Sequence, residues 1–298
     1  MARFGQVLTA MVTPFGADGS LNVDGARKLA THLIDNGSDG VVVAGTTGES
    51  PTLGHDEKLQ LFAGIVEEIG DRATVIAGTG TSNTAEVITL NREAAAVGVD
   101  ALLVVTPYYS KPPQNALLAH YKAIADDAPL PVVLYDVPPR TSRRVEVDTV
   151  VELAAHPNIV ADKDAVGDAS ETAKLRGALD AAGHAGFEIY SGDDGLLLPQ
   201  LAAGAVGIVS VCSHLIGKQI KTIVESFAAG DVDKARKTYL EYLPLMNVIM
   251  GLTASPIPVK AAAEMIGLDV GEPRLPLVAA TTEESKVIRA TLERFGLL

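Results

Sequence analysis

Residues 101–135, ALLVVTPYYSKPPQNALLAHYKAIADDAPLPVVLY, contain an apolar run, an amphipathic stretch and a second apolar run in succession. The two runs, ALLVV and VVLY, are rich in branched side chains and lack polar alternation, which is typical of strands covered on both faces in a parallel sheet. Residues 115–125 between them have the periodicity of a helix. This stretch therefore predicts one strand–helix–strand unit of an α/β protein.

The same alternation continues in both directions along the chain. Further strands are expected at residues 7–12, 40–43, 74–77, 159–162, 187–191 and 206–209. Further helices are expected at residues 24–36, 56–69, 84–97, 147–154, 170–181 and 195–203. Left-handed helix caps, which favour glycine, are expected at Gly37, Gly70, Gly98 and Gly183. Strand–helix units repeated over about 210 residues predict a (β/α)8 TIM barrel.

A doubly wound open sheet is the alternative architecture. It would need a Gly-x-Gly-x-x-Gly turn after the first strand. The chain has Thr13-Pro14-Phe15-Gly16 there, and Gly78-Thr79-Gly80 after the third strand is only a fragment of the motif. Beyond Val211 only helical patterns follow. We therefore expect a barrel domain over residues 1–212 and a C-terminal helical subdomain over residues 213–298.

The composition excludes several classes of protein. The net charge of −13 over 298 residues disfavours binding to nucleic acids, whose phosphates such a surface repels. Although 47% of the residues are hydrophobic, no apolar run is long enough to span a membrane. The single cysteine, Cys212, cannot form an internal disulfide. The sequence contains no His-x-x-x-His spacing, the pattern that would indicate a metal site on a helix. Because the first residues also lack a signal-peptide pattern, we expect a soluble cytoplasmic protein.

Polar residues gather where the predicted strands end. In an α/β barrel the C-terminal ends of the strands form the catalytic face. The segments found there are GTTGES (45–50), TPYY (106–109), DVPPRT (136–141), KD (163–164) and SGDD (191–194). We expect their hydroxyl, phenol and cationic groups to converge on one mouth.

Lys163 is the lysine that closes an apolar strand. Strand alternation places Lys163 on the same face as Ile159 and Ala161, and Asp162 on the opposite face. If the first face is the barrel interior, burial disfavours the ammonium form and leaves a free amine that attacks a ketone. The residues alone also allow a lysine paired with Asp162 or Asp164.

Each of the other candidate residues allows a functional and a structural interpretation. Tyr135 ends the neighbouring strand, where its phenol could shuttle protons or simply fill the core. Thr46 and Thr47 could bind a carboxylate through their backbone N–H groups or form an ordinary turn. Arg140 suits bidentate carboxylate recognition, or it is an exposed loop residue. Spacing alone leaves these alternatives open.

Taken together, these segments resemble the dihydrodipicolinate synthase (4-hydroxy-tetrahydrodipicolinate synthase) family over essentially the whole chain. The matching motifs are GTTGES, TPYYSKPPQ (106–114), YDVPPRT (135–141), KDA (163–165), SGDD, PIPVK (256–260) and RLP (274–276). The resemblance implies a (β/α)8 barrel with a helical C-terminal part, assembled as a homotetramer of two tight dimers. It implies a lyase that condenses pyruvate with L-aspartate 4-semialdehyde in lysine and diaminopimelate biosynthesis, with no metal or organic cofactor.

The resemblance also implies roles for individual residues. Lys163 forms a Schiff base with pyruvate, and Tyr135 donates and accepts protons. Thr46 connects Tyr135 to Tyr109, which comes from the partner subunit. The residues implied to bind the substrates are Thr47, Arg140, Gly192 and the main chain of Val209.

Two other kinds of function are alternatives. Related pyruvate aldolases, acting on N-acetylneuraminate, 2-keto-3-deoxygluconate or 4-hydroxy-2-oxoglutarate, share the lysine and the tyrosine. The double threonine Thr46-Thr47 and Arg140 favour the synthase. A non-catalytic keto-acid-binding protein is expected to have lost Lys163 or Tyr135, and both are present.

Three residues depart from the family pattern. Asp136 and Pro139 stand where the family often has asparagine and glycine. Asp162 stands where a valine or isoleucine normally precedes the lysine. Because a bare carboxylate is costly between the strands and the helices, we expect Asp162 to pair with Lys174 or Arg176.

In lysine-sensitive relatives the inhibitor binds at the tight dimer interface. The matching positions here are Ser50, Pro51, His55, Lys58, Ser82, Glu86 and Tyr108. Lys58 places a positive charge beside the ε-ammonium of the inhibitor, and Ser82 lacks the amide of the usual asparagine. We therefore expect weak or absent inhibition by lysine, unless Lys58 turns outward to solvent.

Overall fold

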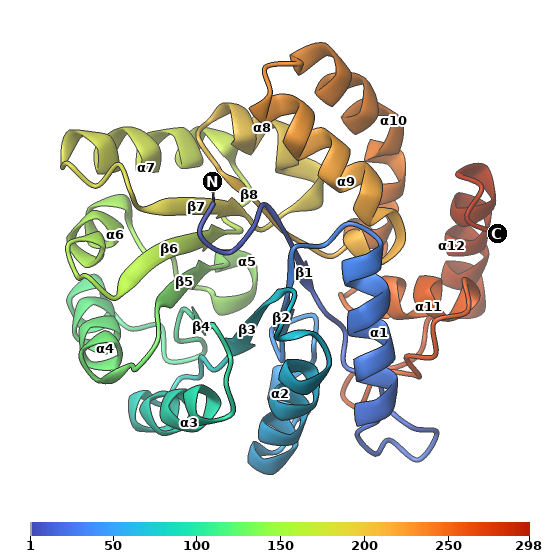
Figure 1. The fold of residues 1–298 in the computed structure, drawn as a ribbon, viewed down its shortest axis with the longest axis horizontal. Helices are drawn as coiled ribbons and strands as arrows, with labels where there is room; N and C mark the ends of the chain where they lie inside the picture. The colour runs from blue at the N-terminus through green and yellow to red at the C-terminus, as the bar shows by residue number, and fades with distance from the viewer. Residues whose placement is uncertain (1) are drawn as a thin grey trace.

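The computed structural model describes residues 2–298 and contains a closed barrel of eight parallel strands (Figure 1). The strands are β1 (Val7–Ala10), β2 (Gly40–Val43), β3 (Thr74–Gly78), β4 (Ala101–Val105), β5 (Val132–Asp136), β6 (Ile159–Asp164), β7 (Glu188–Ser191) and β8 (Gly207–Ser210). Each strand pairs with the next along the chain, and β8 pairs with β1. The predicted TIM barrel is confirmed, and the open sheet is excluded.

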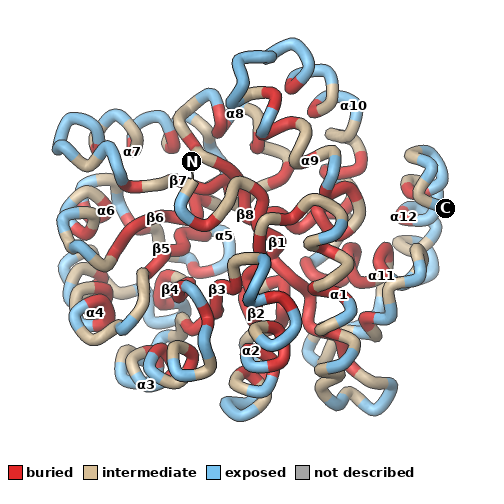
Figure 2. The backbone as a smooth tube through the Cα atoms, viewed as in Figure 1, coloured by how far each residue is buried: buried red, intermediate tan, exposed pale blue. Residues whose placement is uncertain are grey.

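Helices alternate with the strands and form the outer ring seen in Figure 1. They are α1 (Val23–Asp35), α2 (His55–Ile69), α3 (Thr84–Ala96), α4 (Gln114–Asp127), the short α5 (Pro138–Thr141), α6 (Val147–Ala154), α7 (Ala169–Ala181) and α8 (Leu197–Ala202). Figure 2 shows burial concentrated in the strands, while the outer helix faces are exposed. Helices of this amphipathic kind bury one stripe against the barrel and leave the other in water.

Further helices follow β8: α9 (Ser213–Ala228), α10 (Val232–Gly251), α11 (Ile257–Met265) and α12 (Thr282–Arg294). Helix α9 begins just after β8, and the hydroxyls of Ser213 and Thr9 of β1 are hydrogen-bonded at 2.8 Å. Helices α10, α11 and α12 pack on one another at one side of the barrel (Figure 1). The division into a barrel domain and a helical subdomain remains a prediction. Within residues 2–298, no helix is long and apolar enough to cross a membrane.

A β-bulge at the start of β6 changes which side chains face the barrel interior. Ile159 is aligned with Val132 of β5, but the next residue of β5 is aligned with Ala161, so Val160 is an extra residue. Ile159 therefore packs in the cluster between strands and helices, and its predicted place on the face of Lys163 is wrong. After the bulge the alternation is as predicted, with Ala161 and Lys163 aligned with Val133 and Tyr135 of β5.

Three predicted left-handed helix caps are confirmed, with φ of +111°, +93° and +83° at Gly37, Gly98 and Gly183. The fourth prediction is wrong, because Gly70 has φ of −64°. After α2 the chain continues in a right-handed turn, in which the N–H of Arg72 donates to the carbonyl of Ile69.

Candidate active site

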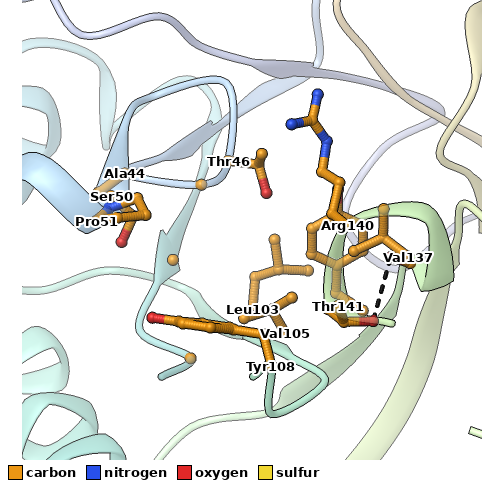
Figure 3. A pocket seen from close by; sticks show the side chains of 14 residues that line it. Ala44, Thr46, Ser50, Pro51, Leu103, Val105, Tyr108, Val137, Arg140 and Thr141 are labelled. Atoms are coloured by element: carbon orange, nitrogen blue, oxygen red, sulfur yellow. Dashed lines mark hydrogen bonds between the residues drawn. The ribbon is translucent and has the colours of Figure 1, made fainter. Parts of the chain in front are cut away.

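A cavity of about 240 Å³ opens at the C-terminal ends of β2 to β5. Its lining comes from the ends of these strands and the segments that follow them: Ala44, Gly45, Thr46, Ser50, Pro51, Gly78, Gly80, Leu103, Val105, Tyr108, Tyr135, Val137, Arg140 and Thr141. Figure 3 shows the Thr46 side chain directed into this space, with Ser50 and Pro51 on one wall and Arg140 on the opposite wall. The cavity thus combines an apolar floor with a few hydroxyls and one cation.

Tyr135 lines this cavity, and Lys163, which is not among the lining residues, lies against the Tyr135 ring. They are aligned partners on β6 and β5, each is 5% exposed, and Nζ of Lys163 lies 4.2 Å from the centroid of the Tyr135 ring. Asp164 does not hold the lysine, because its carboxylate accepts hydrogen bonds from the Val166 N–H and the Thr172 hydroxyl. The barrel therefore places a buried primary amine against a phenol.

The turn after β2 holds the two threonines. The N–H of Glu49 donates to the carbonyl of Thr46 at 3.1 Å, and the N–H of Ser50 donates to that of Gly45 at 3.2 Å. Thr46 lines the cavity, whereas Thr47 is buried within the same turn. Two backbone hydrogen bonds therefore close this turn beside the cavity.

Glycines after β3 allow the neighbouring loops to approach. A Cβ atom on Gly78 would lie 2.3 Å from the carbonyl oxygen of Ala44, and one on Gly80 would lie 2.3 Å from the nitrogen of Val105. The Gly78-Thr79-Gly80 fragment of a dinucleotide motif is therefore a packing feature here. Sequence analysis missed these two glycines as lining residues.

The short helix α5 presents Arg140. Pro138 lies at its first position, where a fixed φ favours helix initiation and no N–H is needed. The Thr141 hydroxyl donates to the carbonyl of Val137 at 3.2 Å, the bond drawn in Figure 3. This loop structure places Arg140 at the mouth of the cavity, as the prediction required.

The model of the dihydrodipicolinate synthetase family matches residues 3–295. The chain belongs to this family. It is 52% identical over 297 residues to the 4-hydroxy-tetrahydrodipicolinate synthase of Moorella thermoacetica, covering 99% of this chain and 100% of the relative. The crystal structure of dihydrodipicolinate synthase from Bacillus anthracis is 46% identical, with a TM-score of 0.93 over 98% of this chain and 99% of that one. The chloride-inhibited dihydrodipicolinate synthase from Acinetobacter baumannii, complexed with pyruvate, is 36% identical, with a TM-score of 0.94 over 99% of this chain and 100% of that one.

Two further residues expected to bind substrate in this synthase family lie on the β7–β8 side of the mouth. Val209 is buried in β8, and Gly192 follows β7 with its N–H donating to the carbonyl of Asp164 at 2.7 Å. Asp194, which sequence analysis placed in a motif without a role, accepts from the Ser210 hydroxyl and the Val211 N–H. Its carboxylate thereby fixes the chain directly after Val209.

Tyr109 lies apart from the cavity of its own chain. Its side chain is 95% exposed, and its backbone has φ of +68°. The adjacent Tyr108 lines the cavity, and its carbonyl accepts a hydrogen bond from the Ser82 hydroxyl at 2.8 Å. The role of Tyr109 in a neighbouring subunit of a family dimer remains a prediction.

The residues that match the family's lysine-binding site have different surroundings in this structure. Ser50 lines the main cavity, and Nε2 of His55 pairs with the carboxylate of Glu93 at 2.8 Å. Lys58 is only 7% exposed, so it does not turn outward to solvent. Burial lowers the pKa of Lys58, and the charge of Glu86 opposes that shift.

Asp162, the most unusual departure from the family pattern, does not have the predicted partner. It is buried, and its Oδ1 has no hydrogen-bond partner. Lys174 pairs with Glu171, and the guanidinium of Arg176 pairs with Asp180. The prediction is wrong because α7 turns Thr172, Leu175 and Leu179 toward the barrel, which leaves positions 174 and 176 on its flanks.

The surroundings of Asp162 are unusually acidic. Asp136 is the aligned partner of Asp164, and both line a small cavity with Asp162 and Arg144. Burial, then the charges of Asp164 and Asp136, raise the pKa of Asp162 well above its ordinary value. Burial also raises the pKa of Asp136 to about 7. Within residues 2–298, no group of His, Cys, Asp and Glu side chains is arranged to hold a metal ion.

Proposed function

We propose that this chain is a 4-hydroxy-tetrahydrodipicolinate synthase that condenses pyruvate with L-aspartate 4-semialdehyde through a Schiff base on Lys163. The observation that carries the proposal is the contact of the Lys163 amine with the ring of Tyr135, which itself lines a cavity together with hydroxyls and Arg140. Membership of the family and the pyruvate complex of the Acinetobacter baumannii relative support it.

The reaction begins at Nζ of Lys163. Its lone pair attacks C2 of pyruvate, the carbonyl oxygen takes up a proton, and loss of water gives a protonated imine. The imine accepts the electron pair of a C3–H bond, so a proton leaves and an enamine forms. Tyr135 is the group placed to donate and accept these protons.

The second half of the reaction joins the carbon chains. The enamine carbon attacks the aldehyde carbon of the semialdehyde, and the aldehyde oxygen takes up a proton. The amino group of the semialdehyde then attacks C2, which closes the ring and releases the Lys163 amine. Arg140 binds the semialdehyde carboxylate, and the turn with Thr46 and Thr47 binds pyruvate, together with Gly192 and Val209. The tetramer and the cytoplasmic location remain predictions.

Reduction with borohydride tests the imine. The protein is incubated with pyruvate, reduced and digested, and the expected mass increase lies on the peptide containing Lys163. The Lys163→Arg variant is the matched control and should carry no adduct there. An unmodified Lys163 in the wild-type protein would contradict the mechanism.

A coupled assay then separates the synthase from related aldolases. Consumption of aspartate semialdehyde with pyruvate is the expected activity. Preferential cleavage of N-acetylneuraminate, 2-keto-3-deoxygluconate or 4-hydroxy-2-oxoglutarate would instead assign the chain to an aldolase.

A further inference from the structure

A buried ion pair joins the C-terminal helices to the turn that carries Thr46 and Thr47. Nζ of Lys260, on α11, lies 2.9 Å from Oε1 of Glu49, and both side chains are 1% exposed. The backbone N–H of Arg274 donates to the other oxygen, Oε2, at 2.8 Å. The C-terminal segment therefore engages both oxygens of one loop carboxylate.

The neighbourhood of this pair is also charged and aromatic. Phe15 lies between two cations, with Nζ of Lys260 at 4.3 Å and Cζ of Arg274 at 4.2 Å from its ring centroid. The Arg274 guanidinium donates to the carbonyl of Thr52 at 2.9 Å and makes two bonds to the Glu57 carboxylate. The C-terminal segment thus holds Glu49 and the chain that follows it.

Glu49 itself has a backbone conformation that needs support. Its φ of +57° is in the left-handed region, which residues other than glycine rarely adopt unless the surrounding structure holds them there. Its N–H closes the turn by donating to the carbonyl of Thr46. The carbonyl of the preceding Gly48 accepts from the Thr13 hydroxyl at 2.6 Å. The direction of the turn's backbone groups therefore depends on where the Glu49 side chain is held.

We propose that the Glu49–Lys260 pair is a positioning device that sets the affinity of the Thr46–Thr47 turn for the keto acid. This inference rests on the proposed function, because it concerns the same turn. Lys260 does not line the cavity, and its ion pair with Glu49 is its contact with the turn that does. Removing one partner of a buried pair leaves an uncompensated charge, and the turn must move to solvate it. Displaced donors bind a carboxylate less well, since such sites depend on preorganisation.

The experiment compares Lys260→Met, Glu49→Gln, the double variant and Lys221→Met. Lys221 is the matched control: its α9 side chain pairs at 2.7 Å with Asp39, which precedes β2 at the opposite end of the barrel. We expect Lys260→Met to raise KM for pyruvate about tenfold or more while kcat changes less than about threefold. The double variant should recover part of that loss, because no unpaired charge is left. Lys221→Met should leave KM unchanged.

Three results would overturn the inference. They are an unchanged KM in Lys260→Met, an equal rise in Lys221→Met, or a double variant no better than Lys260→Met. If Lys260→Met does not fold, Glu49→Gln decides, because it keeps the shape of the side chain: a raised KM supports the inference and an unchanged KM overturns it. Absence of the borohydride adduct in the wild-type protein would instead contradict the proposed function, whatever the variants do.

Discussion

Asp162 places a carboxyl group inside the barrel wall, two residues from Asp164 on the same strand face and close to Asp136 of the neighbouring strand. Three carboxyl groups so close together cannot all be ionised without strong repulsion in a buried place. The charge of Arg144 lowers the pKa of Asp162, but this effect is smaller than the effects of burial, Asp164 and Asp136 that raise it. The raised pKa values of Asp162 and Asp136 mean that these two groups retain protons at pH values where free carboxyl groups have lost them.

We predict that Asp162→Val stabilises the protein by about 1–3 kcal/mol at neutral pH, since it replaces a buried group that lacks a partner by an apolar one. When folding raises the pKa of a carboxyl group, that group makes its full contribution to the stability of the folded state at pH values below its pKa in the unfolded chain. This contribution is lost as the pH rises through the pKa that the group has in the folded protein. The gain should therefore be larger at pH 8 than at pH 5. Thermal unfolding at both pH values measures it, with a change at the exposed Asp71, Asp71→Val, as control; a loss of stability at pH 8 would contradict the prediction.

Lys58 does not turn outward to solvent, which removes the alternative to the prediction about lysine. A second ammonium at ~4 Å costs ~1 kcal/mol in water and ~4 kcal/mol at an effective dielectric constant of ~20. We expect less than half inhibition at about 1 mM L-lysine, because ~1.4 kcal/mol already weakens binding tenfold. Lys58→His should increase the sensitivity. Strong inhibition of the wild-type enzyme, or no change in the variant, would show that the charge of Lys58 is not decisive.

At the scale of elements, the end of β3 shows how a strand terminus shapes the cavity. Gly80 leaves room for the backbone of Val105, and Gly78 leaves room for that of Ala44. Without these close approaches the loops after β2, β3 and β4 would stand further apart. The walls of the cavity are therefore set by glycine positions as much as by polar side chains.

We predict that Gly80→Ala lowers stability by about 1–3 kcal/mol, because the new Cβ would overlap backbone that cannot move freely. It should also slow formation of the Lys163 adduct. Gly177→Ala is the matched control, since nothing lies within 4 Å of a Cβ there, inside helix α7. That change should stabilise by about 0.5–1 kcal/mol. Equal melting temperatures for the two variants would contradict this account.

The strands and helices were predictable because each depends on a local pattern of apolar residues. The bulge at Val160 was not, because it depends on how β6 aligns with β5. Sequence analysis likewise paired Asp162 with a cation of the helix that follows it in the chain, whereas that helix contributes Glu171 and Leu175 to the cavity beside Asp162, and the cation there is Arg144. The pairing of Glu49 with Lys260 joins residues far apart in the chain, and no local pattern indicates it. The placement of Lys163 beside Tyr135 was predictable because both lie near the C-terminal ends of neighbouring strands, and their catalytic roles remain a prediction.

At the scale of the whole molecule, Tyr109 is a large aromatic residue that its own chain leaves 95% exposed. Its left-handed backbone and that of Lys111 give the loop after β4 an unusual, defined shape. An exposed aromatic side chain on such a loop is suited to contact another subunit.

We predict that Tyr109→Phe lowers turnover strongly while the Lys163 adduct still forms, since in its predicted role the hydroxyl completes a neighbour's proton path but does not touch the amine. Turnover is measured by the coupled assay and the adduct by mass spectrometry. Sedimentation velocity should show at least a dimer. A fully active monomer would contradict the shared site.

The pairing of β1 with β8 brings Val7 beside Ile208 and closes the ring. During synthesis, one side of β1 therefore remains without hydrogen-bond partners until the eighth strand has emerged. Open strand edges readily pair with other chains, and contacts between such distant segments form slowly. A newly made chain is thus most exposed to aggregation just before the barrel closes, and closure removes every free strand edge of the barrel at once.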